Sequence, residues 1–142
     1  MSDSVGGVGA AAGTCCLGAT LARFLLQLGR DRDAEELLVD SRSHPYLATR
    51  LQGMSISAVL AARRGDLAEA LRLAGEAEAL AATTDFLMDQ GDVALDRAEV
   101  LQLAGRPAEA RAAAEDALER YERKEYAIGI RSARDFIATL PE

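Results

Sequence analysis

The sequence has little of what catalytic and metal sites require. Its 142 residues include no tryptophan, three phenylalanines, three tyrosines and one histidine. The two cysteines, Cys15 and Cys16, are neighbours, and no distant cysteine is present to form a disulfide with either. Zinc sites and nucleophilic triads need convergent His, Cys or carboxylate groups, whereas His44 precedes a proline in a predicted turn. We therefore expect no catalytic residues, no metal site, no cofactor and no enzyme activity.

Positive charge and long apolar runs are also scarce. There are 16 Lys and Arg against 23 Asp and Glu, which gives a formal net charge of −7. Binding to nucleic acid depends on neutralising phosphates with basic residues, and here no aromatic residues are interleaved with the arginines to stack on bases. The uncharged stretch from Ser4 to Ala22 is interrupted by five glycines, so it predicts neither a membrane span nor an export signal. We expect a cytoplasmic protein that binds neither nucleic acid nor membrane.

Glycine is concentrated at the start of the chain. The run GVGAAAG from Gly7 to Gly13 superficially matches a dinucleotide-binding fingerprint, but that motif needs a preceding strand and none is predicted. A glycine inside a helix costs about 1 kcal/mol relative to alanine. We therefore predict a flexible N-terminus over residues 1–12 and a single helical domain over residues 13–142.

Alanine, leucine and charged residues dominate the rest of the chain. Alanine and leucine are among the best helix formers, and β-branched residues are few. The sequence therefore predicts an all-α fold of about seven helices, at residues 14–28, 31–42, 45–64, 67–82, 85–104, 107–123 and 125–139. Pro45 and Pro107 are typical of the first turn of a helix, and Thr84 or Asp85 can cap the helix that follows them.

Three segments repeat one pattern of small residues. In each, a glycine is followed five residues later by an alanine, and two further small residues stand seven positions outside this pair. The twelve positions are Ala22, Gly29, Ala34 and Ser41; Ala58, Gly65, Ala70 and Ala77; and Ala98, Gly105, Ala110 and Ala117. A repeat of this period indicates an array of helical hairpins.

This pattern resembles the tetratricopeptide repeat, a helix–turn–helix unit whose small residues mark close helix crossings. The resemblance implies an α–α solenoid of about three hairpins, in units at about residues 15–48, 51–84 and 85–123. The large aromatics that the family usually places in the first helix of each unit are absent. The last helix carries an apolar stripe, and we predict that it caps the array; the stripe is Tyr126, Ile130, Ala133, Ile137 and Leu140.

A second resemblance concerns the C-terminal half. The runs from Thr84 to Pro107 and from Leu118 to Lys124 are similar to C-terminal helical repeats of large bacterial signalling proteins, the class III cyclase-like and signal-transduction ATPase-type regulators. In those proteins the repeats follow catalytic or switch domains, and no residue of such domains is present here. The likeness implies a signalling role, either as an excised piece or as a free-standing relative.

The tetratricopeptide resemblance also implies where a partner binds. In that family the first helix of each unit lines an inner groove. The corresponding positions here are Arg23 and Gln27; Gln52, Ser55, Val59 and Arg63; and Asp92, Leu95, Glu99 and Gln102. None is a lysine or asparagine of the kind that clamps a C-terminal carboxylate in the best-known peptide-binding variant, so the resemblance does not favour chaperone-tail binding.

Three functions remain open at this point. The first is a non-enzymatic scaffold or regulatory module that binds a segment of a partner protein in the groove; the sequence does not identify that protein or peptide. The second is a homo-oligomer that assembles through the first and last helices. The third is a regulator that binds a small ligand, which would need a closed pocket with convergent polar groups.

Overall fold

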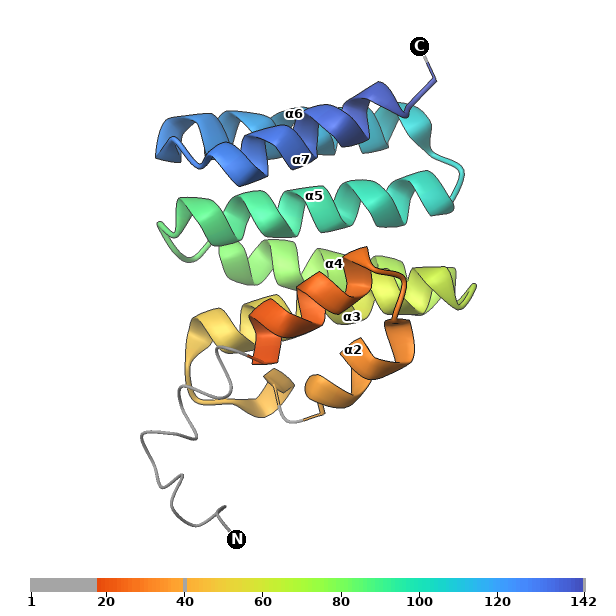
Figure 1. Cartoon of the computed structure of the whole chain (residues 1–142), viewed down its shortest axis with the longest axis vertical. Coiled ribbons are helices and arrows are strands. Elements are labelled where there is room, and N and C mark those ends of the chain that lie inside the picture. Colours follow the sequence, from red (N-terminus) through yellow and green to blue (C-terminus); the bar gives the residue numbers. More distant parts are fainter. Residues whose placement is uncertain (1–17, 40, 142) are drawn as a thin grey trace, which may run out of the picture.

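The computed structural model describes residues 18–39 and 41–141, and over these residues it consists of helices and short connections (Figure 1). The predicted flexible segment 1–12 lies outside the described residues. A helical segment at residues 18–27 is followed by six helices and one 3₁₀ turn: α2 (Asp31–Leu37), η2 (Ser41–Ser43), α3 (Leu47–Arg63), α4 (Leu67–Ala81), α5 (Leu87–Leu103), α6 (Pro107–Lys124) and α7 (Ala127–Ala138). The all-α prediction is confirmed.

The predicted second helix, 31–42, is too long. α2 ends at Leu37, and η2 follows it. The Ser41 hydroxyl donates to the Leu38 carbonyl over 2.8 Å, and such a local bond competes with a continued helix. Ser41 also packs against Gly53 so closely that a Cβ on Gly53 would lie 2.2 Å from its Oγ. α2 therefore ends before Ser41, and the Ser41 side chain packs against Gly53 of α3.

Two of the predicted helix starts are also wrong. α3 begins at Leu47, so Pro45 precedes the helix and its N-cap, Tyr46. The N-cap of α5 is Phe86, whose backbone N–H donates to the Thr84 hydroxyl over 3.2 Å. Thr84 thus shapes the entry to α5 without capping it. Pro107, by contrast, lies in the first turn of α6, as predicted.

The repeated glycines make three equivalent turns. Gly29, Gly65 and Gly105 have φ values of 77°, 91° and 79°, which a side chain would strain. In each turn the glycine N–H donates to the carbonyl three residues earlier, and the next N–H donates to the carbonyl five residues earlier. These two hydrogen bonds satisfy carbonyl groups at the end of one helix, and they fix the turn that leads into the next helix.

The repeated small residues lie where helices cross. Ala22, Ala58 and Ala98 are fully buried, as are all the other alanines of the pattern, and Ser41 is 7% exposed. At such positions a larger side chain would push the backbones apart. The pattern read from the sequence therefore marks the helix contacts of the fold.

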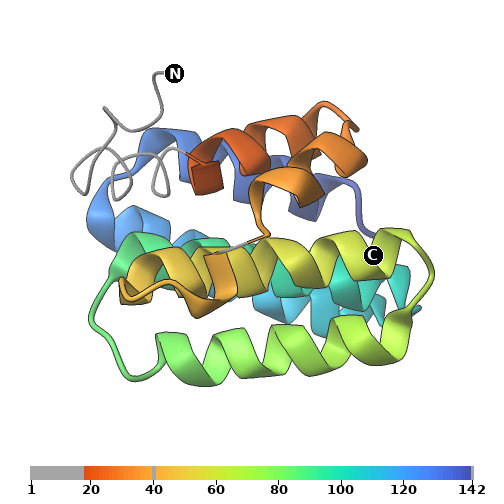
Figure 2. The ribbon, with the colours of Figure 1, turned by 90° about the horizontal axis from the view of Figure 1, so that it is seen from below.

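The helices form hairpins that pack on one another in chain order. α3 pairs with α4 and α5 with α6, while α5 also packs against both α3 and α4, and α7 covers α6 and touches α5. Figure 2 shows the first helical segment, α2 and α7 on one side of α3, with α4 on the other. Ala133 of α7 and Leu140, just after the end of α7, lie in the core, which agrees with the predicted apolar stripe. None of the described helices is long and apolar enough to cross a membrane.

Candidate functional site

A bidentate ion pair joins the first helical segment to α5. Arg23 donates from Nη1 to Asp96 Oδ1 over 2.8 Å and from Nη2 to Oδ2 over 2.9 Å. The Asp96 side chain is 8% exposed and that of Arg23 is 22% exposed. Ser55 of α3 donates to the same carboxylate over 2.5 Å. Because Asp96 is buried, its charge depends on these donors for stability.

Gln52 of α3 connects this pair to two further carboxylates. Its Oε1 accepts from Arg23 Nη2 over 2.6 Å. Its Nε2 donates to Asp89 over 2.7 Å and to Asp92 over 3.0 Å. The Gln52 amide thus uses its oxygen toward Arg23 and its nitrogen toward Asp89 and Asp92. It lies between the guanidinium and these two aspartates.

Tyr121 of α6 completes the network. Its hydroxyl donates to Asp92 over 2.5 Å, and its ring is 2% exposed. Two glycines make room for the ring, since a Cβ on either Gly91 or Gly129 would lie 2.6 Å from a ring atom. We call the seven connected side chains the inner cluster; they are Arg23, Gln52, Ser55, Asp89, Asp92, Asp96 and Tyr121.

The inner cluster carries more negative than positive charge. It contains three aspartates and one arginine, and burial raises the pKa of Asp92 above its ordinary value although Arg23 and Tyr121 oppose that shift. Burial also raises the pKa of the Tyr121 hydroxyl, and the neighbouring Asp92 adds to the increase. The tyrosine is therefore held as a neutral donor.

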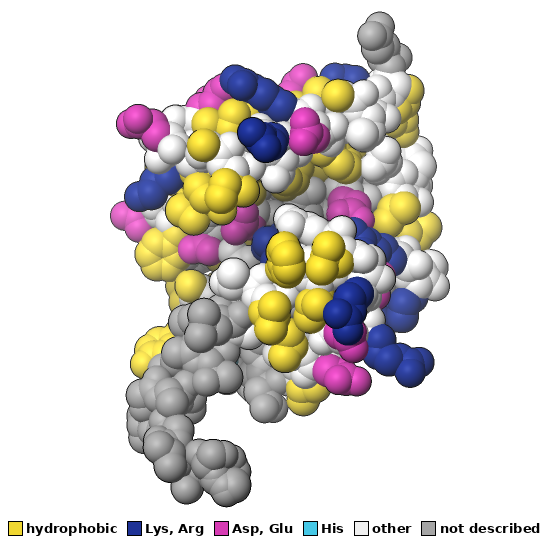
Figure 3. All heavy atoms as spheres, in the orientation of Figure 1, with side chains coloured by type: hydrophobic (Ala, Val, Ile, Leu, Met, Phe, Trp, Pro, Cys, Tyr) yellow, Lys and Arg dark blue, Asp and Glu magenta, His cyan; other side chains and the backbone are white. Residues whose placement is uncertain are grey.

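A surface hollow opens onto this cluster. Its volume is about 250 Å³, and its walls combine Asp89, Asp92 and Arg23 with apolar side chains such as Met88 and Tyr126. Figure 3 shows the surface hollowed between the first helical segment and α7, with acidic side chains inside. We call this space the inner hollow; it is lined by Ala19, Thr20, Arg23, Ala48, Thr49, Gln52, Met88, Asp89, Asp92 and Tyr126.

A second ion-pair group holds the other end of the first hairpin. Arg63 of α3 donates to Glu99 of α5 over 2.9 Å and to Asp31 of α2 over 3.0 Å. It also donates to the Leu26 carbonyl over 2.9 Å, at the end of the first helical segment. Burial raises the pKa of Glu99 although Arg63 opposes the shift. Arg63 thus links α3 to α5, to α2 and to the first helical segment, and both carboxylates of this group already accept from its guanidinium.

The structure separates the ten predicted groove residues into different environments. Arg23, Gln52, Ser55 and Asp92 meet in the inner cluster, while Arg63 and Glu99 form the second group. Ser55 and Val59 are 2% and 0% exposed, so the expectation that their side chains face a partner is corrected: they belong to the interior. Leu95 packs against the cores of α6 and α7. Gln27 is exposed and Gln102 half-buried, and neither contributes to the inner cluster.

Three members of the inner cluster are absent from the sequence prediction: Asp89, Asp96 and Tyr121. The positions carried over from the family select Leu95, whereas Asp96 is the neighbour, about 100° further around the helix. The spacing of Asp89, Asp92 and Asp96 was a usable signal, since residues three, four and seven apart share a helix face. Tyr121 continues the alanine stripe of α6, eleven residues after Ala110.

His44 lies outside the inner cluster, beside the start of α3. The Tyr46 N–H donates to His44 Nδ1 over 3.2 Å at the surface, so one ring nitrogen of His44 takes part in a local hydrogen bond beside Pro45. Within the described residues, no group of three or more His, Cys, Asp or Glu is arranged to hold a metal ion.

Comparisons with family models, curated proteins and solved structures give no match to this chain. The tetratricopeptide and signalling-protein resemblances therefore remain predictions, as does the cytoplasmic location.

Proposed function

We propose that this protein is a non-enzymatic interaction module of the tetratricopeptide type, and that it binds a segment of a partner protein at the inner hollow. We further propose that the segment presents a lysine or arginine beside an apolar side chain. The observation that carries this proposal is the pair of carboxylates, Asp89 and Asp92, in the wall of a hollow that also has apolar walls.

The hydrogen bonds of these two aspartates support a cationic partner group. Asp89 accepts from the neutral Gln52 amide, and Asp92 accepts from that amide and the neutral Tyr121 hydroxyl. The guanidinium of Arg23 donates to Asp96 instead. A partner cation would supply the charge that the neutral donors lack, and the formal net charge of −7 would favour its approach.

The size of the hollows supports a protein partner over a small ligand. Four hollows on the described part of the chain have volumes of about 220 to 290 Å³, whereas pockets for small molecules usually occupy about 300–1,000 Å³. A hollow of this size fits one or two side chains of a longer segment. Such a site adds specificity to a larger contact along the groove.

Selection from a random peptide display library, with the full chain as bait, tests this function. We expect enriched peptides to carry a lysine or arginine next to an apolar residue. Asp89→Asn should weaken binding of the selected peptide about 10-fold, the usual scale for removing one charged partner. Glu115→Gln, at an exposed position on α6, is the matched control and should leave affinity unchanged. Peptides without a basic residue, or equal binding by both variants, would contradict the proposal.

A further inference from the structure

One face of the first helical segment is apolar and is not covered by any other part of the chain that the structure describes. Leu21, Phe24 and Leu28 follow one another at helical spacing, and they are 48%, 55% and 57% exposed. Leu37 and Val39, at and just after the end of α2, add exposed apolar surface. Figure 3 shows hydrophobic side chains gathered over these two elements. A contiguous apolar surface of this kind marks a contact with another molecule.

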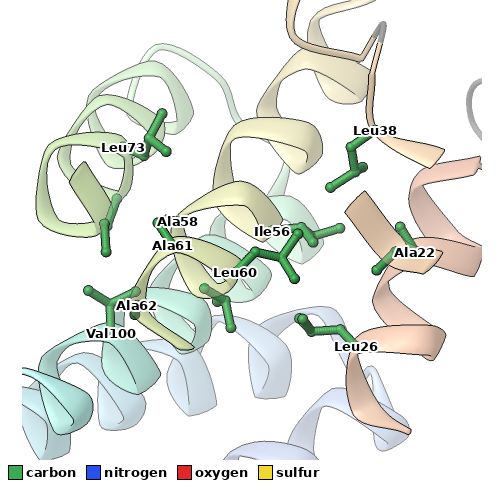
Figure 4. Packing of buried hydrophobic residues seen from close by; sticks show 14 residues of the cluster. Ala22, Leu26, Leu38, Ile56, Ala58, Leu60, Ala61, Ala62, Leu73 and Val100 are labelled. Atoms are coloured by element: carbon green, nitrogen blue, oxygen red, sulfur yellow. The ribbon is translucent and has the colours of Figure 1, made fainter. Parts of the chain in front are cut away.

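The other two repeats show what such a face packs against. The position of Phe24 corresponds to Leu60 in α3 and to Val100 in α5, which are 3% and 0% exposed. Leu60 lies beside Leu38, next to α2, and Val100 belongs to the same buried cluster as Leu73 of α4 (Figure 4). In both cases the preceding hairpin covers the face. The first unit has the same face without that cover over the described residues.

The first face differs from its equivalents in polarity. The position of Leu21 corresponds to Arg97, which pairs with Glu78 of α4 at 3.6 Å. The position of Leu28 corresponds to Arg64, which pairs with a glutamate of α2 at 3.2 Å. At each of these two positions one later unit has an arginine that pairs with a glutamate of the preceding hairpin, and the remaining equivalents are Ser57 and Ala104. The first unit has leucines at both positions, which favours an apolar occupant.

The opposite end of the molecule does not meet this requirement. The exposed side chains of α7 include Arg131, Arg134 and Asp135, so head-to-tail stacking would bury charges against leucines at a cost. The same face of a second copy does meet it. Arg23 is the only charged residue from Gly18 to Leu28, and its guanidinium points into the inner cluster, so Leu21, Phe24 and Leu28 of two copies can meet without a charged side chain of this segment between them.

We propose that two copies of this chain pair through this face, first helical segment against first helical segment about a two-fold axis. The same patch then serves both copies, as closed dimers require. Leu21, Phe24 and Leu28 of each copy become buried. None of these three side chains lines the inner hollow, so the pairing does not rest on the proposed partner binding.

Analytical ultracentrifugation of the full chain from low micromolar to submillimolar concentration tests this pairing. We expect a reversible dimer of the wild-type chain. Phe24→Glu removes two phenylalanines from each dimer and introduces two carboxylates that face one another, so it should weaken dimerisation at least about 100-fold. Ile128→Glu, at a 69% exposed position on α7, is the control and should leave the dimer unchanged. Circular dichroism checks that both variants keep their helix content.

A cross-link identifies the face directly. In a Cys15→Ser, Cys16→Ser background, Phe24→Cys should form a disulfide-linked dimer on mild oxidation, because it lies in the middle of the paired segment. Ile128→Cys in the same background should stay uncoupled. A wild-type chain that is monomeric throughout the concentration range would overturn the proposal. So would a dimer that Ile128→Glu dissociates and Phe24→Glu does not.

Discussion

The first and third hairpins have the same repeated small residues but are held in place by different forces. The third hairpin pairs two long helices, α5 and α6, through Ala98, Ala110, Ala114 and the buried ring of Tyr121. The first hairpin has a second helix of only seven residues. Its buried residues Ala22, Leu26, Ala34 and Leu38 belong to the core that it shares with α3 and α4. Ion pairs that Arg23, Arg63 and Arg64 form with residues far away in the sequence also hold it in place.

This difference implies that the two regions open at different free energies. Apolar burial and close packing stabilise the third hairpin, and local opening there would expose the centre of the molecule. The first hairpin exposes much of its apolar surface already, so its detachment exposes less. We therefore expect the first hairpin to open on its own and the third only on global unfolding.

Tyr121→Ala should have the largest effect, because it removes a ring that is 2% exposed from between Gly91 and Gly129. We expect the free energy of unfolding to fall by about 3–5 kcal/mol, with the loss spread over the whole molecule. Urea denaturation followed by circular dichroism measures it. Tyr46→Ala, at a 53% exposed position, is the control and should cost about 0.5 kcal/mol or less. Equal costs would show that the ring does not support the third hairpin.

Arg23→Ala should have a smaller and more local effect. It leaves Asp96 buried with Ser55 as its remaining donor, and because Arg23 is partly exposed we expect a cost of about 2–3 kcal/mol, below that of a fully buried pair. Hydrogen exchange should show faster exchange in residues 18–37 and little change in α5 and α6. Arg64→Ala breaks a surface pair with Glu35 and should cost less than about 1 kcal/mol. Faster exchange throughout the chain would show that the two hairpins are one cooperative unit.

Asp92→Asn should give the smallest effect, visible as a change with pH. Burial raises the pKa of Asp92 in the folded state, so the folded protein binds this proton more tightly than the unfolded chain does. The contribution of Asp92 to stability is therefore greatest in acid and is lost as pH rises through its folded pKa. Relative to wild type, the variant should become more stable as the pH rises from about 4, the ordinary pKa of an aspartate, through the higher pKa of Asp92 in the folded protein. A difference that shrinks with rising pH would reverse the assigned sign.

The sequence predicted the all-α class, the order of the helices and the burial of the repeated small residues, but not every helix boundary. The repeated small residues predicted the helix contacts because only small side chains permit close contact between helices. Ala22, Ala58 and Ala98 are all fully buried. The α2 boundary was missed because it depends on Ser41 packing against Gly53, a contact between separate elements. Local propensity alone does not contain that information.

The polar site was only partly predictable. Arg23, Val59 and Glu99 occupy the same position in the three repeats, yet the first bonds to a carboxylate across the groove, the second is buried and the third pairs with Arg63. Equivalent positions diverge because each unit has different neighbours on its two sides. The partners of a charged side chain depend on how the units are stacked, which the repeat period does not specify.

The orientation of the Gln52 amide has a consequence for how the protein can vary. Its oxygen accepts from the Arg23 guanidinium of one helix and its nitrogen donates to two carboxylates of another. A flipped amide would place like partners together, and a charged side chain at position 52 would repel either the guanidinium or the carboxylates. Residue 52 is thus expected to change among relatives only together with residues 23, 89 and 92. Relatives of this protein should then show linked substitutions at these four positions, while exposed helix positions outside the proposed contact surfaces vary freely.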